Sequence, residues 1–199
     1  LYDEPFADIS IIPTFMVSGL AAQNILAVFC GVWADEMFGG YWWQKKVAKQ
    51  NVMSRRDLLG DYAEAMSMGR MDSGNLKEYL PGDLLQAARK DSYFFYDKHI
   101  KDGEIPLNAF RYMDAKSFMG ELVLTKVDRA TMAYSLEARV PFLDHELVEF
   151  VFSLSPSVFY DEKKTKFLLR ENIKQHLPAS ILKRKKQGFV GPDKYYGNT

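Results

Sequence analysis

The sequence has one cysteine, no net charge and no long apolar run, and each of these shortages excludes a class of protein. A single cysteine, Cys30, in 199 residues excludes a disulfide framework and suits a reducing compartment, so we expect a cytoplasmic protein. The 26 basic and 26 acidic residues leave no net field that favours nucleic acid or an anionic membrane as a partner. No apolar stretch reaches membrane-spanning length, and the first residues lack the pattern of a secretion signal.

The composition is that of a folded domain. Hydrophobic residues make up 47% of the chain and charged residues 26%, which is too apolar for disorder. A length of 199 residues allows one domain with a sizeable core. We therefore expect residues 1–199 to belong to one domain.

Apolar residues recur at helical spacing through most of the chain. This pattern predicts helices over residues 10–22, 115–136 and 164–177, of which the second is the clearest. Ser54 and Asp144 precede two further helical patterns and can cap them. The sequence therefore predicts a mainly helical structure.

Residues 25–30 form the one convincing strand. The segment is a short, continuous apolar run that ends at Gly31, which is typical of a strand buried on both faces in a parallel sheet. One strand among many helices cannot make a complete sheet. We therefore expect an N-terminal part of the fold to lie outside this sequence.

Two acids and two glycines follow this strand, namely Asp35, Glu36, Gly39 and Gly40. Open α/β sheets bind ligands at the carboxyl ends of their parallel strands. Carboxylates at that place could hold a magnesium ion that bridges phosphates, with Asp35 as the candidate ligand. The alternative is a solvated turn whose glycines permit unusual backbone angles, and the spacing alone favours that alternative.

A basic cluster covers residues 183–186, just before Gly188 and Phe189. Its ammonium groups could neutralise charge that develops on phosphoryl oxygens. They could equally be cations at the solvated end of a helix, where they oppose the negative end of the helix dipole. The pattern leaves both interpretations open.

Charges also interrupt the longest predicted helix and the segment after it. Asp128 and Arg129 lie within the helix, and Glu137 and Arg139 follow it. A buried helix does not accept such charges without partners. They must therefore pair inside a packed domain or line a cleft that receives a charged ligand.

Five ordered blocks of the sequence resemble the synthetase domain of the glutamine-dependent asparagine synthetase family. The blocks cover residues 3–8, 30–41, 126–144, 164–170 and 177–192. They run in order through nearly the whole chain, which is far more specific than any single block.

The resemblance implies an α/β fold of the adenine-nucleotide α-hydrolase, or ATP-pyrophosphatase, type. This chain would hold a predominantly helical part of it, with one or few parallel strands. Such enzymes use ATP and Mg²⁺ to adenylate a carboxylate, normally that of aspartate, and release pyrophosphate. Ammonia from a separate N-terminal glutaminase domain then attacks the acyl-adenylate. The resemblance is also compatible with a homodimer.

The resemblance also implies roles for particular residues. Cys30 and Gly31 fall where the family has Ser-Gly, whose backbone contacts the nucleotide. Asp35 and Glu36 match the rest of that loop. Lys186 matches the lysine that stabilises pyrophosphate and the adenylation transition state. A further set matches residues that shape the site: Asp128, Arg129, Glu137, Arg139, Gly188 and Phe189.

This sequence departs from the family pattern at the turn and in the long helix. Val32 stands where relatives usually carry an acid, and Trp33 and Ala34 replace small residues that are commonly glycine. An acid pair that relatives often show ahead of Lys126 is reduced to Glu121, with Leu122 in the second place. Glu121 is then the remaining candidate for the acid that positions the nucleophile.

Three hypotheses follow. The chain can be part of an asparagine synthetase-like ligase, or of a relative that closes β-lactam rings, macrocyclises peptides or amidates sugars. It can also be a degenerate domain kept for partner binding. The Gly-rich pyrophosphate loop and the glutaminase cysteine lie outside this sequence. We therefore do not expect the chain by itself to complete the reaction.

Overall fold

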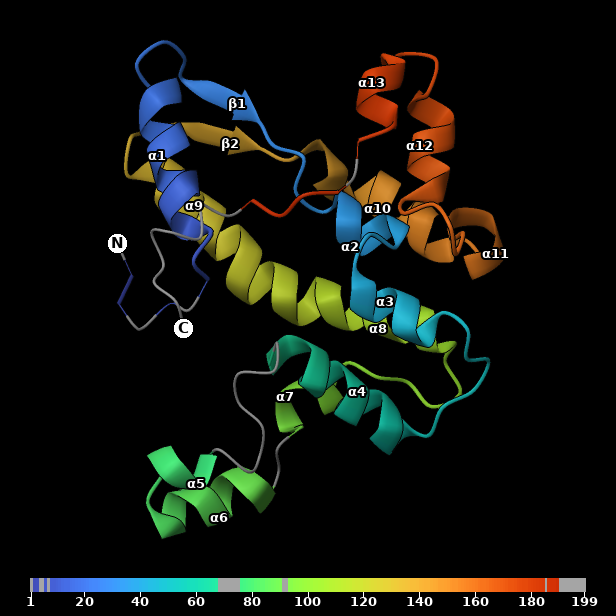
Figure 1. The fold of residues 1–199 in the computed structure, drawn as a ribbon. Coiled ribbons are helices and arrows are strands. Elements are labelled where there is room, and N and C mark those ends of the chain that lie inside the picture. The colour runs from blue at the N-terminus through green and yellow to red at the C-terminus, as the bar shows by residue number, and fades with distance from the viewer. Residues whose placement is uncertain are drawn as a thin grey trace.

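The computed structural model of the chain describes residues 2–3, 6, 8–67, 76–90, 93–184 and 186–189. The first half contains α1 (Ile11–Ala21), β1 (Ala27–Phe29), α2 (Ala34–Phe38), α3 (Trp42–Val47), α4 (Arg55–Ser67), α5 (Leu76–Tyr79), α6 (Gly82–Lys90), α7 (Phe94–Asp97) and α8 (Pro106–Met113). The second half contains the π-helix η1 (Asp114–Leu124), α9 (Thr125–Met132), β2 (Glu137–Arg139), the 3-10 helix η2 (Pro141–Leu143), α10 (His145–Ser153), α11 (Pro156–Phe159), α12 (Phe167–Ile173) and α13 (Ala179–Leu182). The chain is thus mainly helical, as predicted (Figure 1).

The two strands form a small parallel sheet. Ala27, Val28 and Phe29 of β1 align with Glu137, Ala138 and Arg139 of β2, respectively. The amide of Cys30 extends the ladder by donating to the Arg139 carbonyl oxygen at 2.8 Å. The predicted strand and its parallel pairing are therefore present, although the strand is shorter than residues 25–30.

The prediction that this strand is buried on both faces is wrong. Phe29 is 76% exposed and only touches the edge of an open cavity, whereas Val28 is partly buried and lines that cavity. Successive strand residues point to opposite faces of a sheet. Among the described residues, α1 and α9 pack near one face, and nothing covers the face that carries Phe29.

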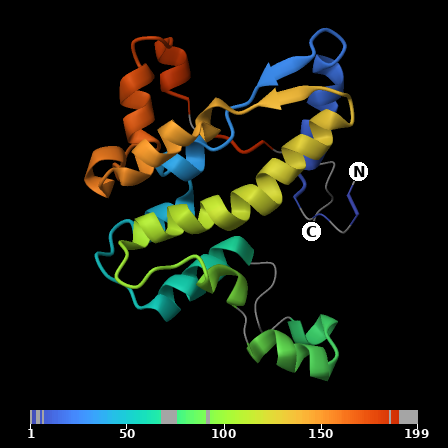
Figure 2. The ribbon, with the colours of Figure 1, turned by 180° about the vertical axis from the view of Figure 1, so that it is seen from behind.

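One long helical segment crosses the middle of the molecule (Figures 1 and 2). It consists of α8, η1 and α9 in succession. The predicted α-helix over residues 115–136 is wrong in two respects, because its first half is a π-helix and its last turn ends at Met132. The predicted apolar face still packs inward through Met119, Val123 and Val127.

Helix α1 lies against α9. Gly19 allows this close approach, since a Cβ atom there would come within 2.8 Å of the Tyr134 ring. The rings of Phe15 and Tyr134 also contact each other, with centroids 4.7 Å apart. An ion pair of 2.7 Å between Asp8 and Lys126 fixes the segment that leads into α1.

Two hydrophobic clusters hold the remaining helices. One joins α3, α4 and α8, and its buried members include Trp43, Val47, Leu58, Tyr62, Phe110 and Met113. The other joins α2, η1 and α10 and contains Trp33, Met37, Phe38, Met119, Val123 and Val151. Helix α2, which follows the turn after β1 (the strand-end turn), therefore packs against a hydrophobic core.

Both predicted helix caps are present. The Ser54 hydroxyl accepts from the Asp57 amide at 3.1 Å ahead of α4, and the Asp144 carboxylate accepts from the Leu147 amide at 3.2 Å in α10.

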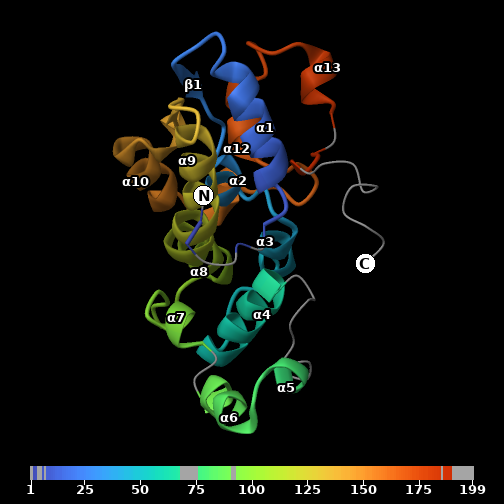
Figure 3. The same cartoon turned by 90° about the vertical axis from the view of Figure 1, so that its left-hand side faces the viewer.

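The pair α5 and α6 lies at the end of the molecule farthest from the sheet (Figure 3). No helix in the described part of the chain has the length and apolar character needed to span a bilayer.

Candidate functional site

The turn from β1 into α2 has a strained residue at its centre. Trp33 has a φ of 82°, a left-handed conformation that is costly for any residue other than glycine. Its indole is buried and stacks on Phe152, with ring centroids 6.4 Å apart. Its buried Nε1 atom has no hydrogen-bond partner. Packing against the core therefore holds this residue in an unfavourable conformation.

Asp35, in the first turn of α2, meets two lysines that come from the C-terminal part of the chain. Its Oδ1 atom lies 2.9 Å from Nζ of Lys186 and 3.3 Å from Nζ of Lys166. That oxygen is shielded from solvent and lacks hydrogen-bond geometry to either cation, so the contacts are ion pairs. Lys186 also donates to the Gly40 carbonyl oxygen at 3.3 Å and lies 4.2 Å from the centroid of the Tyr41 ring.

Glu36 points into the protein beside this ion-pair cluster. The residue is 1% exposed, and its carboxylate accepts a hydrogen bond of 2.5 Å from the Tyr41 hydroxyl. Burial raises the pKa of Glu36, although the Tyr41 hydroxyl partly opposes that rise. The pKa of Tyr41 is raised as well, by burial and by the neighbouring carboxylate. Glu36 therefore fixes Tyr41, whose ring faces Lys186.

A second buried carboxylate, Asp114, ties the site to the helical core. It accepts hydrogen bonds from Gln44 at 2.7 Å, from Tyr62 at 2.8 Å and from the Trp43 indole at 3.2 Å. Burial raises the pKa of Asp114 to about 7, even though its donors favour the charged form. The amide of Gln44 also donates to the Glu36 carbonyl oxygen at 3.3 Å, which links the two carboxylate networks.

Arg111 holds the end of α2, and no acidic side chain in the described part of the chain pairs with it. Its buried guanidinium donates to the carbonyl oxygens of Met37 at 2.9 Å and Val151 at 3.2 Å. The guanidinium carbon also lies 3.9 Å from the centroid of the Phe159 ring. Burial lowers the pKa of Arg111 to about 9. This side chain therefore joins α2, α10 and α11 at one point.

A cavity of about 430 Å³ opens beside the strand-end turn. Its wall is mostly apolar and comes from α1, β1, the turn, η1, α9 and β2. The cation in the wall, Lys126, is held by Asp8 and Ser10 at 2.7 Å each. Burial alone would raise the pKa of Asp8, but these hydrogen bonds outweigh it and hold the pKa below its usual value.

The structure brings some of the predicted site residues together at this cavity. Cys30, Gly31, Asp35, Glu36 and Phe189 line it, and Lys186 reaches its edge through Asp35. Because Phe189 and Lys186 come from the end of the described chain, the C-terminal segment and the strand-end turn form one site. The exposed Gly188 lies between them and does not line the cavity.

Other predicted site residues lie outside the cavity. Glu121 is exposed on η1, and Asp128 and Arg129 are exposed on α9. Glu137 and Arg139 pair with each other at 2.9 Å on the solvent side of β2, while Ala138 between them faces the cavity. Strand alternation explains this placement, because residues 137 and 139 point to one face of β2 and residue 138 points to the other. Their roles in shaping the site stay predictions.

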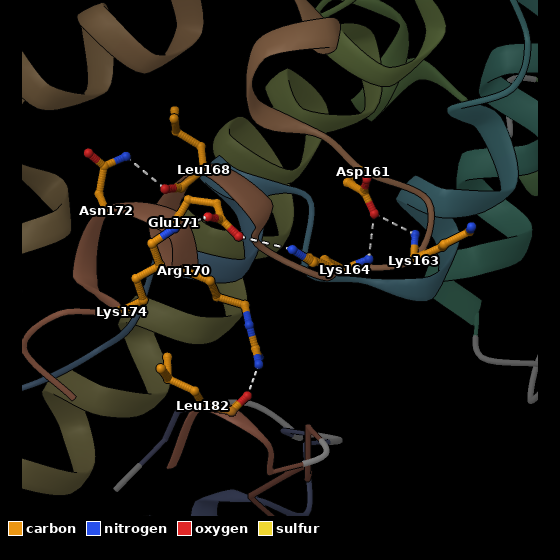
Figure 4. A network of polar contacts seen from close by, with 9 residues as sticks. All are labelled: Asp161, Lys163, Lys164, Leu168, Arg170, Glu171, Asn172, Lys174 and Leu182. Carbon is orange, nitrogen blue, oxygen red and sulfur yellow. Dashed lines mark hydrogen bonds and ion pairs between the residues drawn. The ribbon is translucent and has the colours of Figure 1, made fainter. Parts of the chain in front are cut away.

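Lys166 was not singled out by the sequence, although it lies in one of the blocks that carry the resemblance. It precedes α12 with a φ of 53° and directs its ammonium group to Asp35. Around it, Arg170 donates to the Leu182 carbonyl oxygen, and Glu171 pairs with Lys164 and Lys174 (Figure 4). These two lysines lower the pKa of Glu171 to about 2. The network connects α12 to α13, which leads to Lys186.

The described residues do not form a ready magnesium site. They contain no group of three or more side chains of the metal-binding types. Asp35, the candidate ligand, already has two ammonium groups against one of its oxygens. A cation at that oxygen would have to displace them, so we assign no step to a metal here.

An acid-bearing turn at the carboxyl end of a parallel strand, beside a cavity, is the arrangement of ligand-binding α/β proteins. The asparagine synthase family model matches residues 1–196, and the chain belongs to that family. It is 28% identical to asparagine synthetase [glutamine-hydrolyzing] 1 of Bacillus subtilis over 98% of this chain and 35% of that protein. It is 31% identical to asparagine synthetase [glutamine-hydrolyzing] 3 of the same organism over 84% of this chain and 26% of that protein.

A relative with another name is also similar. Amidase chyE of Penicillium rubens is 24% identical over 91% of this chain and 34% of that protein. The chain spans about a third of the length of these curated relatives. The family is therefore established, and the relatives' names differ in the reaction that they describe.

Proposed function

We propose that this chain is the part of an ATP-dependent ligase that activates a carboxylate, that of aspartate, for amide formation. In the first step a carboxylate oxygen attacks the α-phosphorus of ATP, the bond to the β-phosphate oxygen breaks, and pyrophosphate leaves. In the second step ammonia, released from glutamine by another domain, attacks the acyl carbon. AMP leaves with the bonding electrons, ammonia loses a proton, and asparagine forms.

The position of Lys186 carries this proposal. The side chain comes from the C-terminal segment and yet lies 2.9 Å from Asp35 at the end of β1. An ammonium group at that place can stabilise charge that develops on phosphoryl oxygens. Lys166 supplies a second cation at the same oxygen. Membership of the family and the cavity beside Gly31 agree with a nucleotide at this turn.

The test is aspartate-dependent exchange of radiolabelled pyrophosphate into ATP by the complete gene product. K186A should lower the exchange rate by about 10²–10³, because one preorganised donor to developing charge typically contributes that much. K49A is the matched control, since Lys49 pairs with Glu162 on the surface and should leave the rate unchanged. An unaltered rate in K186A would remove Lys186 from the reaction.

A second candidate keeps the adenylation and changes the acceptor. It is favoured by the apolar cavity wall, where Val32 stands in place of an acid and Trp33 fills the turn. It also agrees with the similarity to a protein named an amidase. A panel of carboxylic acids in the exchange assay separates the two candidates. Pyrophosphate exchange that does not depend on aspartate, but does require a larger or less polar acid, would favour the second candidate.

A further inference from the structure

One oxygen of Asp35 serves two cations. Lys186 and Lys166 approach the same Oδ1 atom at 2.9 and 3.3 Å, while the side chain of Asp35 is only 24% exposed. Each ammonium group carries a full positive charge, so the cluster holds one more positive than negative charge. Glu36 offsets part of this excess, since it interacts electrostatically with Lys186, but its carboxylate accepts from the Tyr41 hydroxyl and forms no direct ion pair with either lysine among the described residues.

The two lysines are held from different elements. Lys166 stands at the start of α12, and Lys186 follows α13. Arg170 of α12 donates to the Leu182 carbonyl oxygen at the end of α13, which restrains one element against the other. The aromatic face of Tyr41 and the Gly40 carbonyl oxygen hold Lys186 from the other side. The cations thus converge on a fixed point, and Asp35 occupies it.

We propose that Asp35 is a resident anion, which fills the place of a phosphoryl oxygen between Lys166 and Lys186 until a phosphate-bearing ligand displaces it. This inference rests on the proposed function and adds a role for Asp35 toward this chain's own lysines. Asp35 keeps the two cations together and at the same time competes with the incoming phosphate. A substitution that removes the negative charge of Asp35 therefore strengthens the binding of a phosphate-bearing anion.

A role as a magnesium ligand alone predicts a different result. If Asp35 served only to hold a metal, its neutralisation would leave metal-free anion binding unchanged and would weaken binding in the presence of Mg²⁺. The measurement that separates the two roles is therefore made without metal. Inorganic pyrophosphate is the probe, because it carries the relevant phosphate chemistry and no nucleoside.

The experiment is calorimetric titration of the complete gene product with pyrophosphate in EDTA. D35N and D35S should bind pyrophosphate about tenfold more tightly than the parent, as expected when two partly buried ion pairs no longer compete. The double variant D35N/K166A should lose that gain. D102N is the matched control, because Asp102 is an exposed partner of Arg55 and its loss should not alter the affinity.

Equal or weaker pyrophosphate binding by both Asp35 variants, with thermal midpoints close to that of the parent, overturns the inference. If one variant is unstable, the other is the test. The outcome is separate from that of the proposed function. Tighter binding without any ATP–pyrophosphate exchange in the parent would keep this inference and remove the ligase proposal, whereas exchange with unchanged binding would do the reverse.

Discussion

The backbone of Gly40 lies against Asp35, with no room for a side chain between them. A Cβ atom at position 40 would come within 2.7 Å of the Asp35 Cγ atom and 2.8 Å of its Cα atom. Real side chains do not tolerate such contacts, and one of the two atoms belongs to the backbone of α2. The glycine is therefore required here by the position of Asp35.

We expect G40A to move Asp35 away from Lys186 and to destabilise the chain by about 1–3 kcal/mol, as overpacking of a close contact does. Urea unfolding measures the loss. G82A is the control, because a Cβ atom at Gly82 would meet no described residue within 4 Å other than its own neighbours along the chain. If G40A and G82A unfold at the same urea concentration, the close contact between Gly40 and Asp35 does not exist in solution.

Asp114 gives the protein a stability that depends on pH. Its pKa in the folded chain is raised to about 7 by burial, above the ordinary value of 3.8. Folding therefore favours the protonated carboxyl. The stability that this group contributes is complete below about pH 4 and is lost as the pH rises to about 7, at up to about 1.4 kcal/mol per pH unit. The raised pKa of Glu36 acts in the same direction.

The measurement is the free energy of unfolding in urea at pH 5.5 and pH 7.5. The parent chain should lose stability through Asp114 at the higher pH, and D114N should reduce that loss. His99, whose pKa is lowered by burial and by Lys98 and Lys116, gains stability over the same interval and acts equally in both proteins, so the difference between the two proteins reports Asp114. D114N should also be less stable than the parent at pH 5.5, because an amide presents an N–H group where Trp43, Gln44 and Tyr62 all donate. D102N should keep the parent's pH dependence. A parent chain whose stability changes between the two pH values by the same amount as that of D114N would contradict the prediction.

Local features of the chain were predicted well because local chemistry determines them. Ser54 and Asp144 cap helices through residues three positions away. The apolar run before Gly31 is a strand with a parallel partner. For the acids after it, the spacing alone favoured a solvated turn, and it was the resemblance to the family that assigned Asp35 and Glu36 to a site; both line the cavity.

Features that depend on distant packing were not predictable in this way. Nothing near Lys166 in the sequence indicates that it meets Asp35, because that contact requires the path of α12 and α13. The π-helix η1 has the same apolar residue types as an α-helix, so its altered hydrogen bonding leaves no clear pattern. The exposure of Phe29 depends on what covers the sheet, which the apolar run itself does not indicate.

Trp33 combines an unfavourable backbone conformation with the favourable burial of its indole, and substitutions separate these two contributions to stability. W33G relieves a left-handed conformation but removes a buried indole, so the net loss should be about 2–4 kcal/mol. W33F keeps most of the burial and removes the unpartnered Nε1, and it should lose less. S135G is the control for the backbone alone, because Ser135 is exposed with a φ of 55°. Urea unfolding should find S135G at least as stable as the parent. If W33G proves as stable as W33F, this account is contradicted.

Gly31 offers a test of ligand approach that is free of folding effects. Apart from the two adjacent residues, a Cβ atom at this position would meet no described residue within 4 Å, yet Gly31 lines the cavity. G31A should therefore match the parent in stability to within about 0.5 kcal/mol. If the nucleotide lies against this backbone, the added methyl group should weaken ATP binding by at least about tenfold, equivalent to about 1.4 kcal/mol. G120A is the matched control, since an added Cβ atom at Gly120 would likewise meet no described residue beyond its own helix, and Gly120 lies on the exposed side of η1, away from the cavity. Calorimetry with ATP on the complete gene product measures both variants. Equal ATP affinity for G31A and G120A would place the nucleotide away from the turn that follows β1.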